Sequence, residues 1–285
     1  MRVGSGLVEE QRGGPFTTAL VLTHGARGDL DALRLPLYAA AAADAGVPCL
    51  RVTLHMRDIT ARAMAMEGVM LKAAQLHPAL KDVRRWVAGG HSVGARAAAR
   101  VAAAVNGAAR GPAGADDAAK ALRGAGHRVT GLLLSSFPAH APGRPDELYD
   151  RLLDELYDRL LVGLKLPMLF FRGTRDNSST QDAWERLRAR LQTKDIEART
   201  RARCVAVVEG GDHMLRIAKG GAKQGAVDAQ LSTALQAFLA SHLKDSGGKG
   251  GDGGGSGGDE PGGGGPGGNG EVNVRRLRRA RRAVH

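Results

Sequence analysis

The chain has 285 residues, two Cys and a formal net charge of +12. This length suits one α/β domain with a substantial core and some appended sequence. Both cysteines stand in apolar, strand-like runs, which argues against a disulfide scaffold and against a Cys-based metal site. No run approaches the roughly 20 apolar residues of a membrane span, and the first residues lack an apolar signal core. We therefore expect a cytoplasmic or nuclear protein without a membrane span.

Strand-like and helix-like segments alternate along the chain from residue 18, and short connections join them. Strands are expected at 18–23, 49–54, 83–88, 129–135, 167–173 and 204–208, and helices at 31–45, 60–77, 95–105, 180–191 and 224–242. Such alternation predicts an α/β fold with a mainly parallel sheet and helices on both faces.

Composition divides the chain into four parts. Residues 1–17 are expected to be an N-terminal extension and 18–244 the folded domain, in which 106–128 is a surface insertion with at most a short helix. Residues 245–270 are a Gly-rich, disordered linker, and 271–285 an Arg-rich tail. The tail is a nuclear-import signal, a polyanion- or protein-binding element, or a basic terminus without a role.

A tandem repeat of DELYDRLL occupies residues 146–161. Eight residues do not match the period of a helix, so the repeat is better explained as one charged amphipathic helix lengthened by duplication. This helix is a candidate lid over an active site. Most of the positive charge lies before residue 245, and solvated helix faces explain it better than a nucleic-acid site does.

The segment Gly89-Gly90-His91-Ser92-Val93-Gly94 joins an expected strand to an Ala-rich expected helix. A strand that enters a helix through G-x-S-x-G is typical of the nucleophile elbow of α/β-hydrolases, in which the serine sits on a strained turn. The residues two before and two after the serine must be small, and Gly90 and Gly94 meet this requirement. The alternative is an ordinary Gly-rich turn whose serine caps the helix.

An exposed serine needs a base to remove its proton and an acid to orient that base. In the hydrolase arrangement the chain order is Ser, Asp, His, and each residue follows the carboxyl end of a strand. Ser92, Asp176 and His213 satisfy both conditions. Asp212 also adjoins His213, but neighbouring side chains in an extended segment point apart, so Asp212 is expected to stabilise the turn.

The oxyanion of an acyl-transfer intermediate needs backbone N–H donors. One is expected from Val93, and the second from the loop after residue 23, where Ala26 is the first choice and Gly25 the alternative. In the same loop His24 is a possible pocket residue, and Arg27 points either into the cleft or into water. Two further possible pocket residues follow strand ends: His91 inside the elbow, and His140.

Five segments together resemble one group of proteins: THGARGD, GGHSVGARAAA, SSFPAHAPGRPDEL, LFFRGTRD and EGGDHML. The chain resembles the small α/β-hydrolase-like family that includes the testis-expressed protein thirty and the hydrolase-like domain of the KANSL subunit of a histone acetyltransferase complex. It is more distantly similar to dienelactone hydrolases. The resemblance covers about residues 18–242 and implies the α/β-hydrolase fold, with a catalytic serine at Ser92. Arg27 and Asn177 depart from the family pattern.

These observations predict a serine hydrolase, of the esterase type, that cleaves an ester, thioester or related acyl bond of a small molecule through an acyl-enzyme. No metal or organic cofactor is indicated. The alternative is a hydrolase fold kept as an interaction scaffold, possibly in the nucleus. Nucleic-acid binding as the main role would rest on the Arg-rich tail alone, since the chain shows no known module and few aromatic residues.

Overall fold

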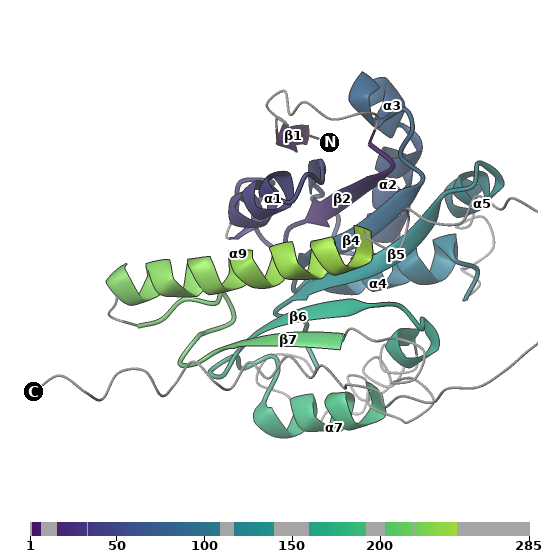
Figure 1. Ribbon diagram of the computed structural model, residues 1–285. Coiled ribbons are helices and arrows are strands. Elements are labelled where there is room, and N and C mark those ends of the chain that lie inside the picture. The colour runs from purple at the N-terminus through teal and green to yellow at the C-terminus, as the bar shows by residue number, and fades with distance from the viewer. Residues whose placement is uncertain are drawn as a thin grey trace, which may run out of the picture. The chain divides into compact units, whose positions relative to one another are not determined.

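The computed structural model describes residues 2–6, 16–32, 34–108, 117–139, 160–191, 203–218 and 221–243. The chain divides into one unit over Met1–Gly247, which contains all of these, and a second over Gly248–His285. The expected linker and tail lie almost entirely in the second unit, outside the described residues. The described elements form a seven-stranded sheet with helices packed against it (Figure 1).

The strand order is β1-β3-β2-β4-β5-β6-β7. Strands β2 to β7 are parallel, and β1 pairs antiparallel with β3 at one edge. The strands are β1 Arg2–Gly6, β2 Thr18–Thr23, β3 Cys49–Thr53, β4 Arg85–His91, β5 Arg128–Ser135, β6 Met168–Gly173 and β7 Arg203–Val208. All six residues of β2 are buried because helices cover both faces of the sheet there, as in parallel sheets generally.

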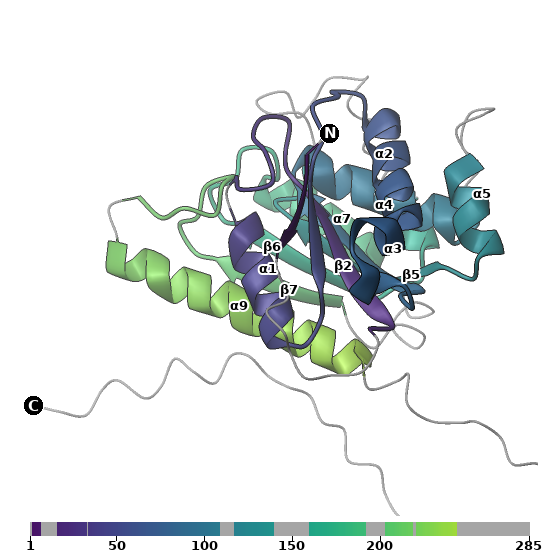
Figure 2. The same cartoon turned by 90° about the horizontal axis from the view of Figure 1, so that it is seen from above.

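Two layers of helices enclose the sheet, as Figure 2 shows from above. The helices are α1 Leu35–Asp44, α2 Ile59–Leu71, α3 Ala73–Leu76, α4 Val93–Val105, α5 Asp117–Gly124, α7 Gln181–Leu191 and α9 Gly221–Leu243, with a 3-10 turn η1 at Pro78–Leu80. Helices α1 and α9 pack on one face through a core that includes Tyr38, Leu231 and Leu235. Helices α2, α4, α5 and α7 share the core of the other face, around Trp86 and Met66. The predicted fold class is confirmed.

Near the N-terminus, two elements differ from the sequence prediction. Residues expected as an N-terminal extension contribute β1, a strand that the sequence analysis missed. Helix α1 begins at Leu35 rather than near Asp31, because Asp29 accepts a hydrogen bond from the Asp31 amide and the Asp31 carboxylate pairs with Arg51. These acids hold the loop instead of capping the helix.

The helix expected over 60–77 is broken at Lys72, whose backbone (φ −94°, ψ 6°) leaves helical geometry. The expected insertion contains its short helix as α5, but Ala119 and Leu122 of that helix are fully buried against the core. This segment is therefore partly a core element rather than a surface insertion. Residues 140–159, which hold His140 and most of the duplicated DELYDRLL, lie outside the described residues.

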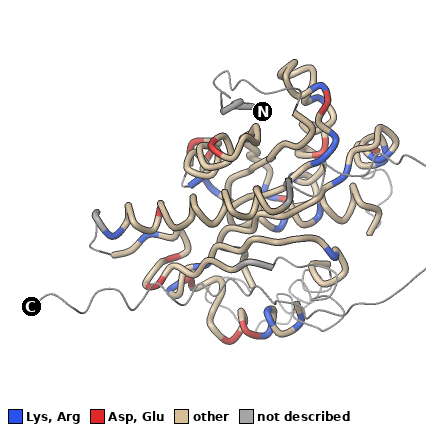
Figure 3. Tube along the Cα trace, viewed as in Figure 1, with Lys and Arg blue, Asp and Glu red and all other residues tan. Residues whose placement is uncertain are grey.

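Basic and acidic residues are distributed over several elements of the described domain and do not gather in one segment (Figure 3). Among the described helices, none has the length and apolarity needed to cross a membrane.

Candidate active site

Ser92 occupies a strained turn between β4 and α4. Its φ of 54° and ψ of −118° lie in a region that non-glycine residues rarely adopt. The turn brings the chain on both sides of the serine into contact. A Cβ at Gly90 would lie 2.6 Å from the carbonyl carbon of Gly94, and a Cβ at Gly94 would lie 2.6 Å from the carbonyl oxygens of Thr23 and His24. Both positions therefore require glycine, as the elbow pattern predicts.

The hydroxyl of Ser92 is not used to cap α4. Ser92 stands at the N-cap position but makes no side-chain capping hydrogen bond. Its amide instead donates to the carbonyl of Ser135 at the end of β5, at 2.9 Å. This geometry excludes the ordinary capped turn that was the alternative to an elbow.

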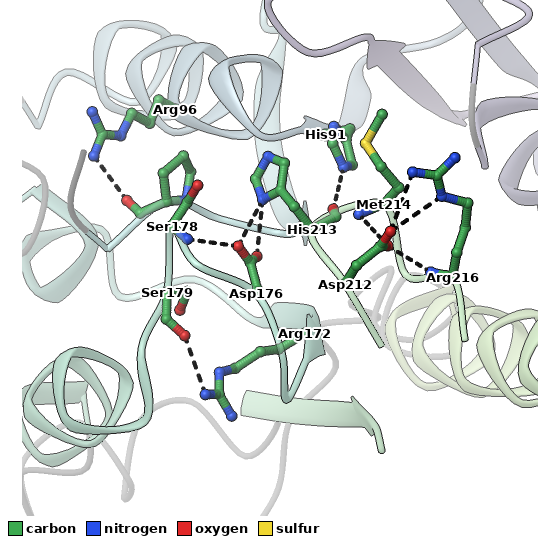
Figure 4. Close-up of polar contacts among 11 residues, drawn as sticks. His91, Arg96, Arg172, Asp176, Ser178, Ser179, Asp212, His213, Met214 and Arg216 are labelled. Carbon is green, nitrogen blue, oxygen red and sulfur yellow. Dashed lines mark hydrogen bonds and ion pairs between the residues drawn. The ribbon is translucent and has the colours of Figure 1, made fainter. Parts of the chain in front are cut away.

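Asp176 and His213 form a direct carboxylate–imidazole pair, as the sequence predicts. His213 Nδ1 lies 2.9 Å from each carboxylate oxygen of Asp176 (Figure 4). Because the carboxylate only accepts, Nδ1 carries the proton, and the lone pair of Nε2 is left to act as a base. The Asp176 side chain is fully buried, and its Oδ1 also accepts from the Ser178 amide at 2.8 Å.

The loops that carry this pair are packed tightly against each other. A Cβ at Gly173 would lie 2.3 Å from the carbonyl oxygen of Gly211, so the close approach requires glycine at this position. The Arg175 amide donates to the same carbonyl oxygen at 2.8 Å. Asp212 turns away from His213 and accepts from the amides of Met214 and Arg216, which confirms its expected turn-stabilising role.

His91 connects the elbow to the loop of His213. Its Nε2 lies 2.9 Å from the main-chain oxygen of His213, and the two imidazole rings meet edge-on with centroids 5.0 Å apart. Within the described residues, the Ser92 hydroxyl makes no hydrogen bond with the His213 imidazole. The structure thus joins Asp176 and His213 by a direct hydrogen bond. Ser92 is connected to this pair through its neighbour His91.

The loop after β2 passes directly beside the elbow. A Cβ at Gly25 would lie 3.5 Å from the Cβ of Ser92. His24 is buried and accepts from the Leu54 amide through Nε2, at 2.9 Å, so its Nδ1 carries the proton that is donated to the Gly25 carbonyl at 2.8 Å. His24 therefore supports this loop through both ring nitrogens. Arg27 is exposed to solvent, and the amide of Val93 begins α4 beside the serine.

Two buried cations beneath the site were missed by the sequence analysis. Arg62 of α2 is 1 % exposed and donates to the carbonyl of His24 at 2.8 Å. Arg172 of β6 donates to the Ser179 carbonyl at 3.1 Å, in the loop that carries Asp176. Burial lowers the pKa of both guanidinium groups. A signal for Arg172 exists in the sequence, since it is the one charged residue in the otherwise apolar expected strand 167–173.

Protonation of His91 should make the fold less stable in mild acid. Burial lowers its pKa from 6.5 to about 4. The hydrogen bond to the His213 carbonyl and the charges of Asp176 and Asp212 raise this pKa, and the charge of the His213 imidazole lowers it, but burial has the largest effect. Between these two pH values the unfolded chain binds a proton that the folded chain does not, so this contribution is complete above pH 6.5 and is lost as the pH falls towards 4. At pH 5 the loss is about 2 kcal/mol.

The measurement is the free energy of unfolding of wild type and His91→Gln at pH 7.5 and pH 5. Burial also lowers the pKa of His24, but His24 is present in both proteins, so its effect cancels in the comparison. Wild type should lose about 2 kcal/mol more than the variant between the two pH values. Equal losses would contradict the buried neutral state of His91.

No group of three or more His, Cys, Asp or Glu side chains in the described part of the chain is arranged to hold a metal ion.

A strained serine between a parallel strand and a helix, with an aspartate–histidine pair at the ends of two later strands, defines the α/β-hydrolase class of folds. The chain belongs to the family described as alpha/beta hydrolase domain, whose model matches residues 16–240.

Solved structures with the same fold include several esterases. Est1E from Butyrivibrio proteoclasticus, with ferulic acid bound, has a TM-score of 0.55 and 12% identity over 85% of this chain and 95% of that chain. A truncated form of a carbohydrate esterase from gut microbiota has a TM-score of 0.54 and 15% identity, covering 82% of this chain and 88% of its own. The Pyrococcus furiosus esterase Pf2001 has a TM-score of 0.52 and 11% identity, covering 80% and 84%. At these identities the likeness establishes the fold.

Proposed function

We propose that this protein is a serine hydrolase that cleaves an ester, thioester or related acyl bond of a small molecule. The observation that carries the proposal is the Asp176–His213 pair, held against the strained elbow of Ser92. The esterase neighbours support the same class of reaction, and the narrower resemblance to the family of the testis-expressed protein thirty remains a prediction.

In the proposed reaction the Ser92 oxygen attacks the carbonyl carbon of the substrate while His213 Nε2 takes the hydroxyl proton. The negative charge on the carbonyl oxygen is stabilised by the Val93 amide and by the amide of Ala26 or Gly25. His213 then gives its proton to the leaving alcohol or thiol, and an acyl group remains on Ser92. Water, activated by the same imidazole, releases the acid and restores the serine.

The missing hydrogen bond between Ser92 and His213 is compatible with this mechanism. In structures without substrate, catalytic hydrogen bonds are often long or poorly aligned, and they tighten in the complex. In the proposed complex, His213 Nε2 and the Ser92 hydroxyl come within hydrogen-bond distance of each other.

The experiment that tests the proposal uses the full chain. Wild type is treated with a fluorophosphonate probe, and hydrolysis is followed for p-nitrophenyl esters of increasing acyl length and for an acyl thioester. We expect one probe adduct per chain, on Ser92, together with turnover of at least one substrate. A wild type that neither labels nor turns over any of them would contradict the proposal.

Replacing Asp176 by Asn should lower kcat by about 10³- to 10⁴-fold. The amide can donate to Nδ1, which favours the wrong imidazole tautomer and removes the charge that stabilises the protonated imidazole. The measurement is kcat and KM on the best ester, with melting curves beside it to confirm folding. An Asn variant with more than about one tenth of wild-type kcat would exclude Asp176 as the orienting acid.

A protein or polyanion partner, and a nuclear location, are proposed only for the Arg-rich tail. That segment lies outside the described residues, so the proposal is supported by the run of six Arg between Arg275 and Arg282. A pull-down from nuclear extract with the full chain and with residues 271–285 removed tests this idea. Equal recovery of the same partners would exclude it.

A further inference from the structure

His91 is a buried imidazole at the end of β4, immediately before Ser92. It is 3 % exposed, and its Nε2 lies 2.9 Å from the main-chain oxygen of His213. A carbonyl oxygen only accepts, so Nε2 carries the proton and donates it. Figure 4 shows this bond beside the Asp176–His213 pair, and it reaches the backbone of the same residue whose side chain the carboxylate holds.

The other ring nitrogen of His91, Nδ1, is buried and makes no hydrogen bond with any described residue. A Cβ at Gly25 would lie 3.0 Å from it. A buried acceptor that is left unpaired costs stability, so an apolar side chain of similar size would fill this space at a lower cost. Among the described residues, the hydrogen bond that the imidazole gains here is its bond to His213.

Other hydrogen bonds of the His213 loop go to its own turn, to Arg34 and to the loop of Asp176. Asp212 binds amides within its own turn, and Arg34 donates to the Leu215 carbonyl and pairs with Asp228 of α9. Asp176 holds the His213 imidazole from the loop after β6. Within the described part of the chain, His91 is the residue that bonds His213 to β4, the strand that leads directly into Ser92.

We propose that His91 is a positioning residue, which fixes the main chain of His213 against the elbow and so sets the distance between the base and the Ser92 hydroxyl. The inference rests on the proposed function. Without this bond Asp176 still orients the imidazole, but the separation of Nε2 from the serine is no longer held. A misplacement of about 1 Å can cost about 100-fold in rate, and substrate binding is not involved. The effect therefore falls on kcat and on the rate of acylation, and not on KM.

The test compares three variants of the full chain, which differ in whether a donor can reach the His213 carbonyl. His91→Leu has no donor, the side chain of His91→Asn is one carbon too short, and the amide nitrogen of His91→Gln stands near the position of Nε2. The measurements are the second-order rate constant of fluorophosphonate labelling, kcat and KM on one ester, and the melting temperature.

We expect His91→Leu and His91→Asn to label and turn over about 10- to 100-fold more slowly than wild type, with KM within about threefold. For His91→Gln, the logarithm of each rate should lie at least halfway from the value of the Leu variant to that of wild type. The matched control is His127→Leu, which removes a half-buried imidazole that accepts from the Trp86 indole at the opposite end of β4. That variant should melt earlier and keep the wild-type rates.

Comparable rates for Gln and Asn variants that both fold would overturn the proposal, even if the Leu variant failed to fold. A wild-type rate in His91→Leu would also overturn it. These results are distinct from failure of the proposed function, in which wild type itself would not label, and which would remove both proposals together.

Discussion

Replacing Ser92 by Ala is expected to abolish fluorophosphonate labelling and to lower ester hydrolysis by at least about 10³-fold. The change removes the one oxygen that can form the acyl-enzyme and leaves the backbone of the turn in place. Residual turnover would come only from oriented water and the neighbouring amides. The measurements are probe labelling followed by mass spectrometry and kcat/KM on the best ester.

The matched control for this prediction is Ser241→Ala in α9, which removes a hydroxyl that donates to the Phe238 carbonyl of its own helix. It should label and turn over as wild type does. Labelling that persisted in Ser92→Ala would place the nucleophile elsewhere and leave the proposed mechanism without its first step.

The strain at Ser92 gives this prediction a second readout. Ser92→Gly also removes the nucleophile, but glycine adopts the φ of 54° without the cost that alanine retains. Both variants should be inactive, while the Gly variant should be the more stable by about 1 kcal/mol. A less stable Gly variant would mean that the turn is not strained.

Replacing Gly94 by Ala is expected to destabilise the domain by more than about 3 kcal/mol. The new Cβ would lie 2.6 Å from two main-chain oxygens, of Thr23 and His24, and β2 cannot move away because its residues are buried between two strands. The variant should therefore melt much earlier than wild type or accumulate as insoluble protein, and the soluble fraction should label poorly.

Gly68→Ala is the matched control, with the same chemical change in the interior of α2. A Cβ there meets no atom within 4 Å, and alanine favours a helix over glycine by about 1 kcal/mol. This variant should melt at a higher temperature than wild type and retain its activity. Equal melting of Gly94→Ala and Gly68→Ala would exclude the close packing of the elbow against β2.

The fold was largely predictable because its signals are local. The run TALVLT predicts β2 with its observed bounds, and the alternation of strands and helices predicts the parallel sheet. Both members of the Asp176–His213 pair were predicted because each follows an apolar strand at its carboxyl end. The glycines of the elbow were predicted for a steric reason that the structure confirms.

What could not be predicted depends on contacts between distant segments. β1 is paired with β3 across more than 40 residues, and its short sequence carries no apolar alternation to indicate a strand. Arg62 and Arg172 are recognisable only once the carbonyls they bind are known. The same holds for His24, whose two bonds to Leu54 and Gly25 show that it supports a loop.

The contact between Gly173 and Gly211 has a consequence for chimeras in which loops are exchanged between relatives of this protein. The backbones at Gly173 and Gly211 lie in contact with no room for a side chain between them. Each loop therefore needs the other as its packing partner. In a chimera that exchanges residues 173–179 alone, the new loop would pack against a 208–217 loop from a different protein. A chimera that exchanges both 173–179 and 208–217 keeps the two packed loops from one parent. Recombination during evolution would face the same restriction, so these two stretches should have been inherited as a pair.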